Sequence, residues 1–324
     1  MPILISEITQ NSLDEILTSR PLHFQLAVSA YGKDSRSTYL ISQLRKMSRK
    51  ILIGIDSIDT LTSHEREKLE KKFFSELICF DDVCAEIRGL ANQSELSEAN
   101  EFHVFIDVSC MSRENMGEIF SCLQELAEEI TVKISIGYCL AHYIRPPDIR
   151  FPLIRRVAPI NPTFSGWGAP ASMPVDTIVS LGYEEGKAIG AVEYLEPRNR
   201  WVFIPHSPES RFLHDVKKHN NLLIESAYGK TIDYEVLRPA DTYFQLLSLV
   251  AGLITESRPV VLPFGPKIFF AISLLVAMRT GKVSIWHVEG DDETPDASPQ
   301  ASGHSVILSC ILSSELKETD PEYS

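Results

Sequence analysis

Short apolar runs alternate with stretches of helical periodicity along most of this chain. The runs are rich in Val and Ile, which is typical of strands that are covered on both faces of a parallel sheet. They predict strands at Phe24–Ser29, Lys50–Ile55, His103–Val108, Val132–Tyr138, Thr177–Leu181, Trp201–Ile204, Ile232–Leu237, Val260–Leu262, Val283–Val288 and Ser305–Leu312. We expect the last of these to be an antiparallel edge strand of a second lobe.

The segments between these runs predict helices, because their apolar residues recur at three- and four-residue spacing. The predicted helices are Ser37–Met47, His64–Phe74, Glu114–Glu129, Gly186–Leu195, Pro208–Leu223, Ala240–Ser257 and Lys267–Arg279, with a further helical segment expected in Ile3–Ser19. Strands that alternate with helices form parallel sheets with right-handed crossovers. The fold class is therefore predicted to be α/β, with two Rossmann-like lobes and mainly parallel sheets.

A proline-rich region separates the two sets of elements. Residues 144–175 hold seven of the nineteen prolines, which argues against a helix or a central strand there. We expect an N-terminal lobe at 1–143, an inter-lobe linker or lid at 144–175, and a C-terminal lobe at 176–324. Residues 289–303 are acidic and small, and they predict a surface loop of the second lobe.

The two lobes repeat the same signals, which predicts an internal duplication. The first strand of each lobe leads into a polar turn, Tyr31–Arg36 in one and Gly182–Lys187 in the other. A later strand of each lobe is followed at the same distance by a basic residue, Arg113 or Lys267. Paired strand–loop–helix units place such turns at a crevice at the carboxyl ends of the strands, where ligands bind.

Arg113 and Lys267 are candidates for contacts with an anion. Each stands at the predicted amino end of a helix, where free N–H groups and the helix dipole attract anions. Ser109, Ser112 and the small residue Gly265 lie beside them in the sequence and are further candidate ligand contacts. The alternative is structural, with Ser112 as a helix cap and Arg113 as a solvated residue of the first turn.

The turn at Tyr31–Arg36 supplies a second set of candidates, Lys33, Asp34, Ser35 and Arg36. The turn resembles the Gly-Gly-x-Asp-Ser phosphate loop of the PP-loop ATP pyrophosphatases, with Tyr31 in place of the first glycine. Lys33 and Arg36 are expected to contact the anion. The alternative is a polar turn in which Asp34 or Ser35 caps the next helix.

Asp107 ends a predicted strand at the point where ligands sit in parallel sheets. It is a candidate general base, ribose ligand or metal ligand, and hydrogen bonding to loop N–H groups is the alternative. Glu184 is a candidate of the same kind in the second lobe, and His142 and His206 also follow predicted strands. Walker, Gly-x-Gly-x-x-Gly and Gly-x-Ser-x-Gly motifs are absent, so the sequence assigns no reaction and no cofactor.

Charge and cysteine usage narrow the classes of partner. The 324 residues carry a formal net charge of −13, which argues against a general nucleic-acid coat or an anionic-membrane binder. The most apolar stretches, Phe244–Ile254 and Ile268–Met278, are about half the ~20 residues that span a bilayer. The first residues lack the basic region of a secretory signal, and the six cysteines form no Cys-x-x-Cys pair. We therefore expect a cytoplasmic protein with reduced thiols and no metal site.

Several segments resemble a group of bacterial proteins associated with anti-phage defence. They are, in order along the chain, Tyr31–Arg36, Ile106–Arg113, Ser165–Trp167, Leu181–Glu184 and Pro263–Lys267. A lobe with a polar loop after its first strand and an Asp-x-Ser loop after a later strand is also similar to CARF-type sensor domains. That resemblance implies recognition of a signalling oligonucleotide, a homodimer, and effector activity in a separate domain or partner chain.

The residues and the resemblances together favour a sensor that binds a nucleotide or other phosphate-bearing ligand in bacterial defence or stress signalling. In this hypothesis Arg113, Lys267, Lys33 and Arg36 hold the anion, while Asp107 and the turn at Gly265 shape the pocket. Two alternatives stay open. One is an enzyme that acts on a nucleotide or phosphoribosyl compound, and the other is a scaffold subunit of a defence complex.

Overall fold

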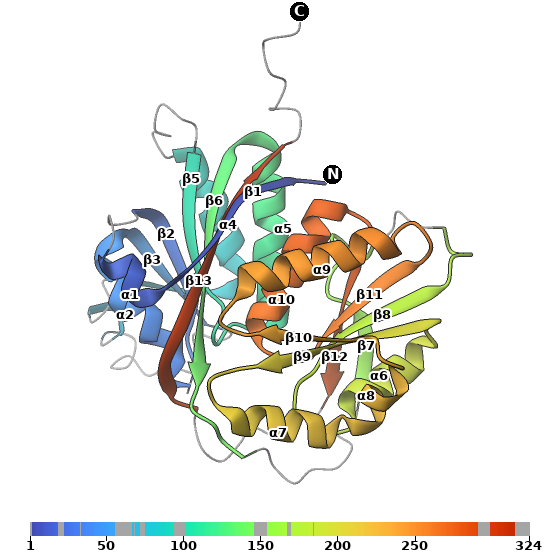
Figure 1. The fold of residues 1–324 in the computed structure, drawn as a ribbon. Helices are drawn as coiled ribbons and strands as arrows, with labels where there is room; N and C mark the ends of the chain where they lie inside the picture. Colours follow the sequence, from blue (N-terminus) through green and yellow to red (C-terminus); the bar gives the residue numbers. More distant parts are fainter. Residues whose placement is uncertain are drawn as a thin grey trace, which may run out of the picture. The chain divides into compact units, whose positions relative to one another are not determined.

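The chain divides into two compact units, each with a mainly parallel sheet and interleaved helices, which confirms the predicted α/β class (Figure 1). Unit 1 comprises Met1–Lys33, Ser37–Tyr138 and Ile307–Ser324, and unit 2 comprises Asp34–Arg36 and Cys139–Val306. The computed structural model describes residues 2–18, 23–32, 34–55, 67, 69–71, 75–93, 101–145, 154–166, 170–183, 185–290 and 299–314.

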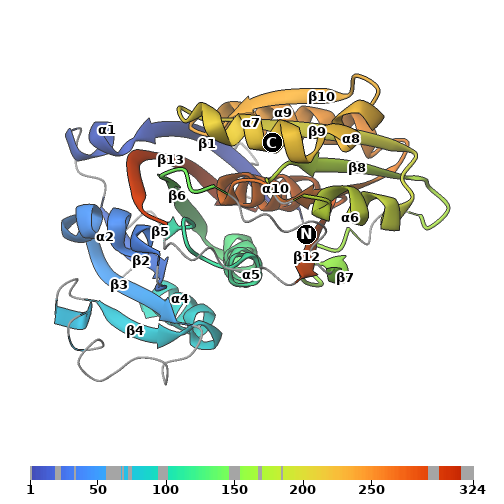
Figure 2. The same ribbon diagram turned by 90° about the horizontal axis from the view of Figure 1, so that it is seen from below.

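Unit 1 is built on a seven-stranded sheet of order β1-β13-β6-β5-β2-β3-β4. Its strands are β1 (Leu4–Ser12), β2 (Phe24–Ala30), β3 (Ser48–Ile55), β4 (Glu76–Cys79), β5 (Glu101–Asp107), β6 (Thr131–Ala141) and β13 (Ala301–Ser313). The five strands from β2 to β6 are parallel. The helices are α1 (Leu13–Thr18), α2 (Tyr39–Leu44), α4 (Phe80–Gln93) and α5 (Arg113–Glu129), with 3-10 turns η1 (Ser35–Thr38) and η2 (Arg45–Met47) flanking α2. Figure 2 shows α4 and α5 together on one face of this sheet and α2 on the other.

Unit 2 is built on a six-stranded sheet of order β10-β9-β8-β11-β12-β7. Its strands are β7 (Ile154–Pro159), β8 (Val175–Ser180), β9 (Asn199–His206), β10 (Thr231–Glu235), β11 (Arg258–Pro263) and β12 (Ser284–Gly290). All are parallel except β7, which runs antiparallel to β12. The helices are α6 (Lys187–Leu195), α7 (Ser210–His219), α8 (Asn221–Ser226), α9 (Pro239–Leu253) and α10 (Lys267–Thr280). In Figure 1, α6, α7 and α8 cover one face of the sheet, while α9 and α10 cover the other.

The parallel strands of the two units follow the same order. Numbered along the chain within each unit, they stand 3-2-1-4-5, as β4-β3-β2-β5-β6 in unit 1 and β10-β9-β8-β11-β12 in unit 2. In such sheets the strand order reverses beside the first strand, and ligands bind at the carboxyl edge there. That point follows β2 and β5 in unit 1, and β8 and β11 in unit 2. The shared order is the architecture that an internal duplication predicts.

In each half of the chain, the strand that follows the five parallel strands joins the sheet built mainly by the other half. β7 follows β6 along the chain, but it pairs with β12 of unit 2, where Val157 lies opposite Val288. β13 follows β12 along the chain, but it lies between β6 and β1 in the sheet of unit 1. Each sheet is therefore extended by a strand that the other half of the sequence supplies.

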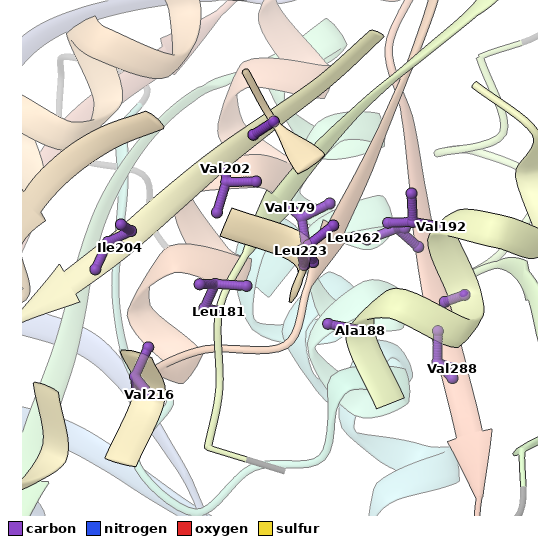
Figure 3. Packing of buried hydrophobic residues seen from close by; sticks show 12 residues of the cluster. Val179, Leu181, Ala188, Val192, Val202, Ile204, Val216, Leu223, Leu262 and Val288 are labelled. Carbon is purple, nitrogen blue, oxygen red and sulfur yellow. The ribbon is translucent and has the colours of Figure 1, made fainter. Parts of the chain in front are cut away.

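The core of unit 2 explains why its strands are apolar runs rather than alternating patterns. One face of the sheet packs against α6, α7 and α8 through a cluster of small and branched apolar side chains (Figure 3). The cluster consists of Val179, Leu181, Ala188, Ala191, Val192, Val202, Ile204, Val216, Leu223, Ala227, Leu262 and Val288. On the other face, the rings of Phe203, Tyr234 and Phe269 pack with centroids 5.1 to 6.1 Å apart. Because consecutive strand residues point to opposite faces, both must be apolar.

Helix α10 is apolar around its whole circumference. Its residues from Ile268 to Met278 are all buried, so the helix has no polar face. A helix of this kind belongs to the core of a large protein or to a membrane span. In the part of the chain that the structure describes, no helix is both long and apolar enough to cross a bilayer.

Several elements differ from the sequence prediction. The expected helical segment Ile3–Ser19 is mostly strand β1, with only Leu13–Thr18 helical, because Ile3 and Ile5 are buried at the two-residue spacing of a strand. The expected edge strand near the end, β13, lies inside the sheet of unit 1 rather than at an edge of the second lobe. The expected helix Pro208–Leu223 is broken into α7 and α8 at Asn220, whose Nδ2 donates to the carbonyls of Gly182 and Val216.

Some elements of the structure were not predicted, and some predicted segments are only partly described. The sequence pattern did not predict β4 or α4, and β7 lies within the proline-rich region 144–175. β7 is an edge strand, which is compatible with the prolines around it. Most of the predicted helix His64–Phe74 and the middle of the acidic loop 289–303 lie outside the described residues, as does Trp167.

Candidate functional site

The loop after β5 in unit 1 is organised by Asp107. The side chain is almost fully buried at the end of the strand, with 1% of its surface exposed. Its Oδ1 accepts a hydrogen bond from the backbone N–H of Ser109 at 2.9 Å. Ser109 is buried as well. The carboxylate therefore has the structural role of holding the backbone between β5 and α5, and this loop carries two other candidates.

Ser112 and Arg113 stand at the start of α5. Ser112 is the N-cap of this helix, and its Oγ accepts from the backbone N–H of Asn115 at 3.0 Å. Arg113 is the first helical residue and is half-buried. A hydroxyl that accepts in a cap still has its own proton to donate. The capping role and a ligand contact through Ser112 are therefore compatible.

The turn after β2 is held together by its own residues. The carboxylate of Asp34 accepts from the guanidinium of Arg36, with Nε–Oδ2 at 2.9 Å and a terminal nitrogen to Oδ2 at 2.5 Å. The third guanidinium nitrogen of Arg36 donates to the carbonyl of Cys139 at 3.3 Å. An anion that binds Arg36 would compete with Asp34 for the same donors.

Ser35 ties this turn to a distant part of unit 2. Its backbone N–H donates to the carbonyl of Pro299 at 3.2 Å, and its Oγ accepts from the N–H of Ala301 at 3.2 Å. Lys33, in the same turn, lies outside the described residues. The turn therefore fixes residues 299–301, which lead into β13.

In unit 2, Gly265 lets the loop after β11 lie directly against the end of β8. The N–H groups of Phe264 and Gly265 both donate to the carbonyl of Ser180, at 2.9 and 3.1 Å. A Cβ at position 265 would stand 2.6 Å from the carbonyl oxygen of Leu181 and 2.6 Å from Ser180 Oγ. Ser180 Oγ in turn lies 3.0 Å from the hydroxyl of Tyr234. A side chain at this position would displace backbone at the reversal point of the sheet.

Lys267 occupies the same place in unit 2 that Arg113 occupies in unit 1. It is half-buried and is the first residue of α10, which follows β11. The N-cap of α10 is Pro266, so this helix has no side-chain cap of the kind that Ser112 gives α5. Glu184, in the loop before α6, lies outside the described residues.

The two candidate histidines lie in different settings. His206 ends β9, and its Nε2 lies 2.6 Å from Oδ1 of Asp233 on the neighbouring strand β10. His142 follows β6 and is exposed, and its backbone N–H donates to the carbonyl of Gln300 at 2.8 Å. Of these two histidines, only His206 has a carboxylate partner for its ring among the contacts of the described chain.

An aromatic cluster in unit 2 was not predicted from the sequence. Tyr143, Tyr183 and Phe212 pack with ring centroids 5.2 and 6.2 Å apart, and the guanidinium of Arg211 lies 4.5 Å from the centre of the Tyr143 ring. Phe212 and Arg211 come from α7, and Tyr183 follows β8. The cluster therefore stands beside the carboxyl ends of β8 and β9, where the parallel sheet favours ligands.

Hydrogen bonds between ionisable side chains hold the polar groups of this cluster in place. Tyr143 donates its hydroxyl proton to Oδ2 of Asp215 at 2.5 Å, and this hydrogen bond raises the pKa of Tyr143. Burial alone would raise the pKa of Asp215, but the hydrogen bonds from Tyr143 and His214 outweigh it and hold the pKa below its ordinary value. Hydrogen bonds from Arg211 lower the pKa of Glu209 to about 2. Near neutral pH, Tyr143 is therefore protonated, while Asp215 and Glu209 are ionised.

The local pattern gave one usable signal for this cluster. Tyr143 and Tyr183 each follow a predicted strand closely, but their partners on α7 lie far away in sequence.

Within the described ranges, no three His, Cys, Asp or Glu side chains gather into a group that could hold a metal ion. Compared with models of known protein families and with curated protein sequences, the chain matches none.

Proposed function

We propose that this chain binds a nucleotide or another phosphate-bearing ligand at the carboxyl edges of its parallel sheets. The observation that supports this proposal most is the equivalent place of two basic residues. Arg113 and Lys267 are each the first residue of the helix that follows the fourth parallel strand of a 3-2-1-4-5 sheet. Binding of an anionic ligand would explain the positions of both Arg113 and Lys267.

The helix dipole explains why a basic residue at the first position of a helix indicates an anion site. The amino end of a helix carries a partial positive charge, so a cation there is unfavourable unless an anion lies nearby. A phosphate at this point would accept from the helix N–H groups and from the basic side chain. A hydrogen bond to a charged group contributes about 1.5–3 kcal/mol, which repays the unfavourable placement of the cation.

Neighbouring groups fit the same kind of ligand. Ser112 has a hydroxyl proton to donate beside Arg113, and Gly265 lets the loop before Lys267 pack directly against the end of β8. In unit 2, the rings of Tyr143 and Tyr183 offer flat surfaces of the kind on which nucleobases stack. These features favour a nucleotide over inorganic phosphate.

The biological role we propose is that of a sensor in bacterial defence or stress signalling. It rests on the resemblance of the chain to defence-associated proteins and to CARF-type sensor domains. That resemblance adds a homodimer and effector activity carried by a partner chain, and the cysteine usage and the first residues of the chain add a cytoplasmic location. In this role the ligand is recognised and is not consumed.

An enzyme that acts on a nucleotide is the second candidate function, and one observation favours it. His206 and Asp233 form a close histidine–carboxylate pair at the carboxyl end of β9 and β10. Such a pair orients the imidazole for proton transfer. Incubation of the protein with a nucleotide panel distinguishes the two functions, because a sensor leaves the panel unchanged.

The first experiment is mass spectrometry of small molecules released from protein purified from its native host. We expect a phosphate compound from the wild type and its loss from an Arg113→Gln/Lys267→Gln variant. A Lys217→Gln/Lys282→Gln variant is the matched control, because both lysines are exposed and lie away from the helix starts. Equal recovery from all three proteins would refute the assignment of the site.

A further inference from the structure

A cavity of about 440 Å³ opens at the opposite, amino-terminal edge of the sheet of unit 1. Its walls come from the starts of three neighbouring parallel strands, β2, β3 and β5, and from the turn η2 that precedes β3. The volume lies in the range of about 300–1,000 Å³ that small-molecule sites occupy. The candidates at the carboxyl edge take no part in this cavity.

The lining of the cavity is positively charged. Lys46 and Arg49 contribute to it, and neither forms an ion pair with any residue that the structure describes. The carboxylate in the lining, Glu101, is already neutralised, because Lys133 Nζ lies 2.7 Å from its Oε2. The hydrogen bond from Lys133 holds the pKa of Glu101 below its ordinary value. Lys46 and Arg49, both exposed, are therefore left without a carboxylate partner among the described residues, in a chain whose net charge is −13.

Two histidines and a glutamine complete the polar wall. Gln25 braces β2 against β5, since its Oε1 accepts from the N–H of His103 and its Nε2 donates to the carbonyl of Glu101 at 3.3 Å. His103 is half-buried, and burial lowers the pKa of its ring, so the imidazole is neutral near pH 7. His23 lies beside it in the lining.

We propose that this cavity is a second binding site, and that it takes a phosphate monoester of a small organic molecule. The two charges of the phosphate match Lys46 and Arg49. Phe24 and Met47 give the cavity an apolar wall for the organic part of the ligand. The site stands at the amino end of the sheet and is independent of the function proposed for the carboxyl edge.

The test is NMR titration of protein labelled at its histidines, with phenyl phosphate as the probe and benzoate as a singly charged control of similar shape. We expect phenyl phosphate to shift the His23 and His103 signals and benzoate to bind at least tenfold more weakly. The variant Lys46→Gln/Arg49→Gln should lose at least tenfold in affinity. The variant Lys217→Gln/Lys282→Gln should bind as the wild type does.

Unshifted histidine signals, or equal affinity in the Lys46→Gln/Arg49→Gln variant, would overturn the proposal. It would also be overturned if binding were lost in Arg113→Gln/Lys267→Gln alone, since the probe would then occupy the carboxyl edge.

Discussion

Removal of β13 is the most direct test of the strand exchange. The perturbation is a chain that ends after Gly290 and so lacks the whole strand, and its control is a chain that ends after Ser314 and keeps it. The side chains of Ile307, Leu308 and Leu312 are fully buried in unit 1. Burial of one such side chain stabilises by about 1.5–3 kcal/mol, so the three together contribute about 5–9 kcal/mol.

That sum is comparable to the whole stability of a folded domain, which is about 5–15 kcal/mol. The truncated chain also exposes the edge of β6, an eleven-residue strand with a largely buried, apolar sequence. An exposed apolar edge of this length favours aggregation. We therefore expect the sheet of unit 1 to unfold in the truncated chain.

Hydrogen exchange measured by mass spectrometry gives the readout strand by strand. Amides of β5 and β6 should lose protection in the chain that ends after Gly290, whereas the chain that ends after Ser314 should keep it. Addition of a peptide spanning 299–314 should restore protection, because it supplies the missing strand. If β6 were equally protected in both chains, β13 would not complete this sheet and the reasoning would fail.

Two further predictions concern unit 2. Gly265→Ala should destabilise the protein by about 1–3 kcal/mol, because the new Cβ would overlap the carbonyl oxygen of Leu181; a denaturant midpoint equal to that of the wild type would show that the loop relaxes freely. Burial raises the pKa of Asp176, but hydrogen bonds, above all from Arg198, outweigh this and hold the pKa below its ordinary value. A lowered folded-state pKa stabilises the fold above the unfolded value, and this stability is lost as the pH falls through the folded value. Urea unfolding of the wild type should therefore become easier below pH 4, and Asp176→Asn should show a smaller change between pH 5 and pH 3; equal changes in both proteins would contradict the assignment.

The strands that the sequence pattern missed share a place in the fold. β1, β4 and β7 are all at the edges of their sheets. An edge strand is covered less completely than a central one, so it needs no continuous apolar run. β7 contains two adjacent arginines, Arg155 and Arg156, and β4 has only four residues. Central strands such as β8 and β9 were predicted because burial on both faces requires apolar side chains at successive positions.

The candidate site was predictable only where local sequence determines it. A residue at the end of an apolar run lies at the carboxyl edge of a parallel sheet, which is how Asp107 and Lys267 were found. The partners of these residues come from distant segments and leave no local pattern. Ser35 meets Pro299, and Tyr143 meets Asp215, across long sequence separations that only the folded chain reveals.

The exchanged strands also have a consequence for synthesis of the protein. About 160 residues separate the end of β6 from the start of β13. At roughly 5–20 residues per second, a ribosome needs about 10–30 s to bridge that gap. Throughout that interval the nascent first half carries a sheet with an open edge, whose partner strand has not yet been made. Until β13 is made, the edge of β6 is therefore open to pairing with another chain in each round of translation.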